Sequence, residues 1–270
     1  MSSADARFDK VKISGPSLAY RPTSNNAWWT NWLKQIAQAG TIPDQWSYHL
    51  EGALDAIDND PQYTNASLGG LLKQYDLPDR ETCINEYAEY SEMFPSGYAW
   101  WISRLERLDF WGLLGNWQGG TVLHDLFANL LTKKSNPKDY GGTDYAGAPG
   151  YWVYKYYAQN MTGHRVKTTG SSDNWFDVYA TVGDRVRLLA GAKIREGSYK
   201  VQVDRLSSVG LPTSGTLKVD MWSFSGTNQF AVQAAPAFWG TTSTSYSGDS
   251  VTIPIRQTDK TTGWAIEFSI

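Results

Sequence analysis

Three short apolar segments of this sequence each end in side chains that could attack, protonate or hold a substrate. The ends supply a phenol, an imidazole, two carboxylates, an amide and an indole: Tyr48, His49, Glu51, Asn85, Glu86 and Trp117. A carboxylate beside an apolar segment can attack an electrophilic carbon or move a proton. An indole offers an apolar surface on which a sugar ring can rest. These residues are therefore the candidates for a functional site.

Several candidates also have a purely structural explanation. Glu86 directly follows an apolar segment, so it could be a buried carboxylate held by hydrogen bonds. His49 could be a packed or capping histidine, Trp117 could belong to the core, and Glu51 could be a loop charge. Residue type alone leaves both explanations open, and the elements that carry the candidates must be considered next.

Patterns typical of strands and helices alternate before residue 165. They predict strands at residues 11–13, 43–49, 82–88 and 113–117, and helices at residues 26–38, 67–75, 97–108 and 151–157. Residues 14–16 are expected to form the loop that ends the first strand. This alternation predicts βα units around a parallel sheet. Functional side chains gather at the carboxyl ends of such strands, where the candidates lie.

The pattern changes after about residue 165 to short alternating segments separated by Gly, Ser and Thr. Residues 175–180 and 186–189 predict a hairpin with Gly183-Asp184 in its turn. Further strands are expected at residues 199–203, 217–222, 251–255 and 264–270. We therefore predict two domains, with βα units at residues 1–164 and an antiparallel β-sandwich at residues 165–270.

Composition excludes several classes of protein. The 24 basic and 27 acidic residues give a net charge of −3, so no basic surface for nucleic acid or a polybasic membrane patch is expected. No apolar run approaches the ~18 residues of a membrane helix, and residues 1–15 contain no apolar stretch of a secretion signal. A single Cys and three scattered His predict neither a metal site nor a cofactor. The 13 Trp and 16 Tyr suit a core or an aromatic platform for a ligand.

Six segments together resemble fungal glycoside hydrolases of the family 39 type, which are clan A (β/α)8 barrels. They are KISGPSLA (12–19), PDQWSYHLEG (43–52), INEYA (84–88), AWWISRLERL (99–108), LGNW (114–117) and GYWVYKYYAQNMTGHRV (150–166). Their order along the chain is more specific than any one of them. The resemblance implies that residues 1–164 are strands five to eight of the barrel. The fold class it implies is α/β plus all-β, a partial TIM-type barrel followed by a sandwich.

The resemblance also implies roles for the candidates. Glu86 matches the catalytic nucleophile at the end of strand seven. His49 and Tyr48 match strand-six residues that contact the sugar or the nucleophile, and Trp117 matches the platform of strand eight. The ligand would be a carbohydrate, with Glu51 and Asn85 among its contacts. The resemblance also implies an extracellular location.

One departure from the family pattern bears on activity. The family carries its acid/base glutamate in a Trp-Asn-Glu-Pro type of motif after strand four, and no such motif occurs in this sequence. We therefore expect weak or no hydrolysis from this chain alone, unless Glu51 substitutes for the acid. A lectin-like carbohydrate-binding protein is the alternative, and an inactive fold fragment is a third. Open barrel edges could be covered by a homodimer, by the sandwich or by the N-terminal segment.

Overall fold

The computed structural model describes residues 10–51, 59–114, 130–136, 141–229 and 231–270. The chain divides into two compact units. The first comprises Met1–Glu89 and Leu108–Asn116, and the second comprises Tyr90–Arg107 and Trp117–Ile270. The domain boundary after residue 164 stays a prediction. No helix within the described ranges is both long and apolar enough to cross a membrane.

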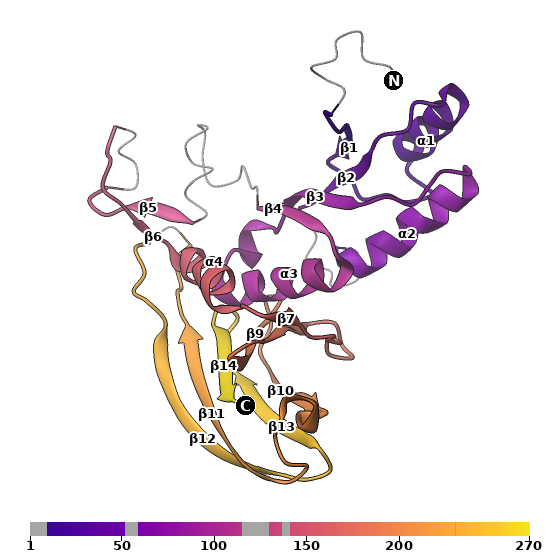
Figure 1. Ribbon diagram of the computed structural model, residues 1–270. Helices are drawn as coiled ribbons and strands as arrows, with labels where there is room; N and C mark the ends of the chain where they lie inside the picture. The colour runs from indigo at the N-terminus through magenta and orange to yellow at the C-terminus, as the bar shows by residue number, and fades with distance from the viewer. Residues whose placement is uncertain (1–9, 52–58, 115–129, 137–140, 230) are drawn as a thin grey trace. The chain divides into compact units, whose positions relative to one another are not determined.

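A four-stranded parallel sheet forms the centre of the first unit (Figure 1). Its strands are β1 (Ser14–Leu18), β2 (Gln45–Leu50), β3 (Thr82–Tyr87) and β4 (Trp111–Leu114), in that spatial order. The predicted parallel arrangement is confirmed. The first strand was placed too early, because residues 14–16 belong to β1 and not to a loop. Pro16 is compatible with this strand because β1 is an outer strand, where a missing N–H need not break the sheet.

Helices α1 (Ala27–Ala39) and α2 (Pro61–Gln74) connect the first three strands. Asn26 caps α1 by accepting hydrogen bonds from the first backbone amides, and Gly40 ends it with a φ of 65°. The α2 helix begins at Pro61 and not at residue 67 as predicted. Asp60 accepts a hydrogen bond from the Gln62 amide, so the Asp-Pro pair is the start signal.

Both helices contact Tyr48 of β2. The indole of Trp29 on α1 contacts the Tyr48 ring edge-on, with 6.1 Å between ring centroids. Trp32 meets Trp46 in the same manner at 6.0 Å. Thr64 of α2 hydrogen-bonds the Tyr48 hydroxyl. Alternate residues of β2 therefore face the helices, and the residues between them face the other side of the sheet.

In its described part, the second unit combines helices with antiparallel sheets. Helix α3 (Pro95–Leu108), of which Leu108 belongs to the first unit, and the short helix η2 (Tyr90–Glu92) precede a small sheet of β5 (Leu131–Lys133) and β6 (Tyr145–Gly147). Helix α4 (Pro149–Asn160) follows. The predicted helices at residues 97–108 and 151–157 lie within α3 and α4.

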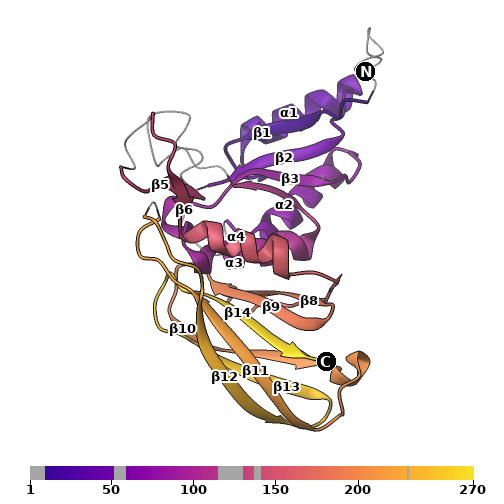
Figure 2. The ribbon, with the colours of Figure 1, turned by 60° about the vertical axis from the view of Figure 1, so that its left-hand side comes forward.

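Two further antiparallel sheets share one apolar core. The six-stranded sheet has the order β12-β11-β14-β9-β8-β7, and β10 pairs with β13 (Figure 2). Their bounds are β7 (His164–Arg165), β8 (Phe176–Val182), β9 (Arg185–Ala192), β10 (Gly197–Asp204), β11 (Gly215–Phe224), β12 (Ala237–Tyr246), β13 (Ser250–Gln257) and β14 (Gly263–Ser269), with η5 (Leu206–Val209) after β10. Leu188 and Ile266 of the large sheet share a core with Val201 and Ile253 of the small one. The predicted hairpin at Gly183-Asp184 is the β8–β9 connection.

Candidate functional site

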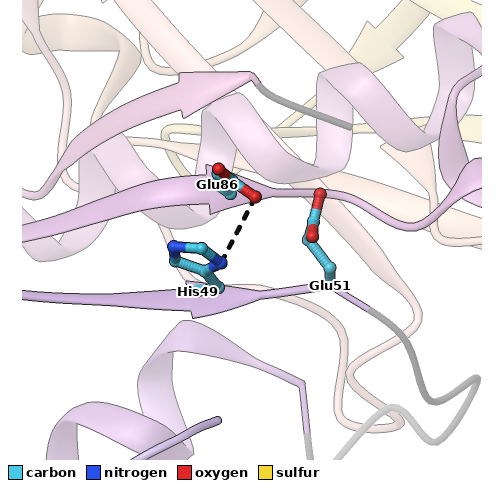
Figure 3. Close-up of side chains that lie close together, drawn as sticks. All are labelled: His49, Glu51 and Glu86. Atoms are coloured by element: carbon cyan, nitrogen blue, oxygen red, sulfur yellow. Dashed lines mark ion pairs between the residues drawn. The ribbon is translucent and has the colours of Figure 1, made fainter. Parts of the chain in front are cut away.

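Three of the candidate side chains converge where β2 and β3 end. Figure 3 shows His49 on β2, and Glu51 directly after it, reaching toward Glu86 on β3. All three are partly buried. The two strands are parallel neighbours, so their carboxyl ends meet at one edge of the sheet.

A shift in register between β2 and β3 brings these residues opposite one another. Tyr48 pairs with Ile84, and the next residue, His49, pairs with Glu86. Asn85 is therefore the extra residue of a bulge, a feature that re-aims side chains beside functional sites. Because of it, two successive residues of β3 reach the same imidazole ring.

The ring of His49 lies between these two residues. Its Nδ1 is 3.2 Å from Oε2 of Glu86, and its Nε2 is 3.2 Å from Nδ2 of Asn85. An amide nitrogen can only donate, so Nε2 accepts and the ring hydrogen is on Nδ1. The Nδ1 hydrogen thus faces the Glu86 carboxylate, and this contact favours negative charge on Glu86. Asn85 fixes the orientation of the ring.

Glu51 has a different electrostatic environment. Burial, the negative charge of Glu86 and a hydrogen bond with Glu86 raise the pKa of the Glu51 carboxyl from its ordinary value to about 7. Among the described residues, no N–H or hydroxyl group donates to its buried Oε1. The neutral form is therefore favoured well above the pH at which an exposed glutamate ionises.

Glu51 and His49 line a cavity of about 660 Å³. The rest of its lining consists mainly of polar residues that sequence reasoning missed, with two alanines: Ala19, Tyr20, Arg21, Thr23, Asn25, Asn26, Ala27 and Asn59. Most of them belong to the segment that follows the carboxyl end of β1. This position after a strand of a parallel sheet is the sequence feature that could have identified them. Amides, hydroxyls and a guanidinium suit a ligand with many hydroxyl groups.

The same cluster has the donor atoms of a metal site. One nitrogen of His49 and one carboxylate oxygen each of Glu51 and Glu86 all lie within 4.8 Å of one another. These groups already contact each other, with the imidazole 3.2 Å from Glu86 and the two carboxyl groups sharing a hydrogen bond. We therefore attribute the cluster to acid–base chemistry and assign no metal ligand. The absence of metal and cofactor stays a prediction.

Two candidates are not brought into this cluster. Tyr48 is fully buried, hydrogen-bonded to Thr64 and packed on Trp29, so its side chain lies on the helix side of the sheet. Alternation along a strand requires this, because its neighbour His49 points to the opposite side. Trp117 lies outside the described residues. Asn85 contributes to the cluster by orienting the ring of His49.

Comparisons of the whole chain identify the type of fold. No family model and no curated protein matches the sequence. Among solved structures, N2152 from Neocallimastix frontalis is 22% identical, with a TM-score of 0.74 over 97% of this chain and 62% of that one. A glucosidase from Croceicoccus marinus is 15% identical, with a TM-score of 0.60 over 98% of this chain and 61% of that one. A GH39 β-xylosidase from Caulobacter crescentus is 14% identical, with a TM-score of 0.50 over 96% and 57%.

The fold of this chain is therefore glycoside hydrolase-like, and it combines a parallel sheet with antiparallel sheets. The chain spans about three-fifths of the length of the structures it matches. Identities this low define the fold alone.

Proposed function

We propose that this chain is a carbohydrate-active protein of a retaining glycoside hydrolase lineage resembling family 39, with Glu86 as its nucleophile. The observation that carries this proposal is the pairing of Glu86 with Glu51 in a glycoside hydrolase-like fold. Their nearest carboxyl oxygens lie within 4.8 Å. Carboxyl groups this close leave no room between them for the water of an inverting enzyme, whose carboxyl groups lie about 6.5–9.5 Å apart, so the arrangement favours the retaining class.

In this proposal β1 to β4 correspond to strands five to eight of a (β/α)8 barrel, followed by the sandwich. Glu86 attacks the anomeric carbon, His49 supports its charge, and Asn85 orients His49. Trp117 forms the platform under the sugar ring. Tyr48 is not proposed as a sugar contact, because its buried ring supports β2 from the helix side.

The sequence lacks the acid/base motif of the family, so we expect weak hydrolysis of glycosides with poor leaving groups. The named neighbours include a glucosidase and a β-xylosidase, so we propose glucosides and xylosides as the first ligands to test. An extracellular location is also proposed, from the family resemblance.

Covalent trapping tests the role of Glu86 without requiring an acid. A dinitrophenyl 2-deoxy-2-fluoro-β-xyloside or β-glucoside carries a leaving group that departs unprotonated and forms a long-lived glycosyl ester. We expect mass spectrometry to find the sugar on Glu86 and no label on Glu86→Gln. Glu81→Gln is the matched control, because this exposed residue of the same unit undergoes the same change. No label, or a label elsewhere, would contradict the proposal.

A lectin-like protein is the second candidate, favoured by the 13 Trp and by the missing motif. In that case the sugar binds without chemistry. Calorimetry would show binding that survives Glu86→Gln and is abolished by Trp117→Ala, with no covalent label on the wild type.

A further inference from the structure

We propose that Glu51 is the general acid/base of this site and protonates the departing oxygen while Glu86 attacks. This inference rests on the proposed function and adds the catalytic residue that the family motif would otherwise supply. It also implies that the weak hydrolysis expected of this chain depends on Glu51.

The geometry gives Glu51 access to the reaction. Glu51, directly after β2, and Glu86, on the neighbouring parallel strand β3, bring carboxyl oxygens within 4.8 Å of each other (Figure 3). Glu51 also lines the 660 Å³ cavity, so a ligand bound there can meet its carboxyl group. In a retaining enzyme both carboxyl groups act on the same anomeric centre, which requires them to lie close together as these two do.

The charges around Glu51 favour a proton on this residue. Glu86 on β3 opposes its ionisation, and the ring nitrogen of His49 that could carry a proton toward a carboxylate lies 3.2 Å from Glu86. Arg21, in the segment after β1, is the cation of the cavity lining. The Glu51 pKa of about 7 is the value expected of a group that gives and takes protons near neutral pH. Of two neighbouring carboxyl groups, the one whose surroundings raise its pKa is the one suited to act as the acid.

Formation and hydrolysis of the glycosyl ester need no reactant other than the glycoside and water. A Glu86 oxygen bonds to the anomeric carbon while the bond to the leaving oxygen breaks, and that oxygen keeps the electron pair and takes the Glu51 proton. The alcohol departs, leaving a glycosyl ester and an ionised Glu51. Glu51 then removes a proton from water as the water oxygen bonds to the anomeric carbon. The ester bond breaks, and free sugar, ionised Glu86 and protonated Glu51 result.

A leaving-group comparison separates an acid from a merely structural residue. In Glu51→Gln, kcat/KM on phenyl β-xyloside or β-glucoside should fall at least about 100-fold, because phenolate needs protonation. On the dinitrophenyl glycoside kcat/KM should change less than about 3-fold, because that leaving group needs no acid. On the dinitrophenyl glycoside, azide should raise kcat of Glu51→Gln and yield the glycosyl azide. Azide attacks the glycosyl ester without the help of a general base.

The pH profile provides a second readout. Wild-type kcat/KM on the phenyl glycoside should fall as pH rises through about 7, because Glu51 loses its proton. This alkaline fall should be absent in Glu51→Gln and retained in Glu81→Gln. Glu51→Asp keeps a carboxyl group and should retain the alkaline fall at a lower rate. It serves as the test if the Gln variant does not fold.

The outcomes distinguish this inference from the function on which it rests. If the fluorosugar labels Glu86 but Glu51→Gln slows both glycosides equally and azide has no effect, the role of Glu51 is overturned and that of Glu86 stands. If Glu86 is not labelled and neither glycoside is hydrolysed, both proposals fail. Selective loss on the phenyl glycoside together with azide rescue supports Glu51.

Discussion

Glu51 and Glu86 are chemically identical side chains that their neighbours make different. The imidazole of His49 lies 3.2 Å from Glu86, a contact that favours negative charge there. Glu51 meets the charge of Glu86 instead, and among the described residues no amide or hydroxyl donor reaches its buried Oε1. The surroundings of Glu51 thus favour its neutral form, which is the asymmetry between two carboxyl groups that acid–base chemistry requires.

This asymmetry predicts a change in stability with pH. The pKa of Glu51 is higher in the folded chain, at about 7, than the ordinary value of 4.5. Its protonation therefore stabilises the fold fully below the ordinary value, and this contribution is lost as pH rises through about 7. Glu51→Gln stays neutral and avoids the loss. Its melting temperature relative to wild type should rise by about 1–3 °C between about pH 5 and about pH 9, a value reduced for the partial exposure of the group.

Calorimetry at the two pH values measures the melting temperatures of wild type and Glu51→Gln. For the control Glu81→Gln, the difference in melting temperature from wild type should be the same at both pH values. An equal difference at both pH values would show that Glu51 ionises like an exposed glutamate.

Part of this cluster could be predicted from residue types together with their positions at strand ends. His49, Glu51 and Glu86 were found because strand-end residues of parallel sheets share one edge. The different surroundings of the two glutamates were not predictable from the sequence. They depend on the bulge at Asn85 and on the orientation of the His49 ring, whose Nδ1 faces Glu86 and whose Nε2 faces Asn85. Tyr48 was misplaced because its position next to His49 puts it on the opposite face of the strand.

At the scale of elements, the parallel sheet changes register near the carboxyl end of each strand pair. The shifts fall between Pro16 and Leu18, between Tyr48 and His49, and in the third pair between Ile84 and Tyr87. Bulges bend strands and re-aim their side chains. In the β2–β3 pair this irregularity brings His49 opposite Glu86, while Trp46 and Tyr48 of β2 contact the connecting helices.

Two kinds of glycine in the connecting helices should respond oppositely to alanine. Gly40 ends α1 with a φ of 65°, and a Cβ there would touch nothing within 4 Å. Gly40→Ala should therefore lower the free energy of unfolding by about 1 kcal/mol through backbone strain alone. Gly69 lies inside α2 with equally open space. Gly69→Ala should raise the free energy by about 0.5–1 kcal/mol.

Urea unfolding of the two variants measures both effects, and each serves as the control for the other. If both changes had the same sign, the left-handed backbone at Gly40 would not be the feature that ends α1.

Most elements could be predicted where start and stop residues frame an apolar pattern, as Asn26 and Gly40 frame α1. The prediction failed where these signals are weak. Strand β12 was missed because its Gly, Ser and Thr are typical of turns, although it pairs along most of β11. The short β5 and β6 have too few residues to show a period.

At the scale of the whole molecule, the outer strands of the parallel sheet expose large apolar side chains. Trp111 and Leu113 on β4 are 62% and 60% exposed, and Val11 and Ile13, just before β1, are 60% and 49% exposed. Outer strands with apolar side chains are sites of association. A second copy of this chain that covers these edges would be related by a twofold axis and bury the same surface on both copies.

We therefore predict a homodimer that depends on the β4 edge. Light scattering during size-exclusion chromatography should give twice the mass of the single chain at high protein concentration. The double variant Trp111→Ser with Leu113→Ser should give the single-chain mass, because it removes the apolar surface that association would bury. Trp239→Ser is the matched control, since Trp239 is 67% exposed but lies on β12 of the second unit. A single-chain mass at every concentration, or a dimer that persists in the double variant, would show that a second copy does not cover this edge.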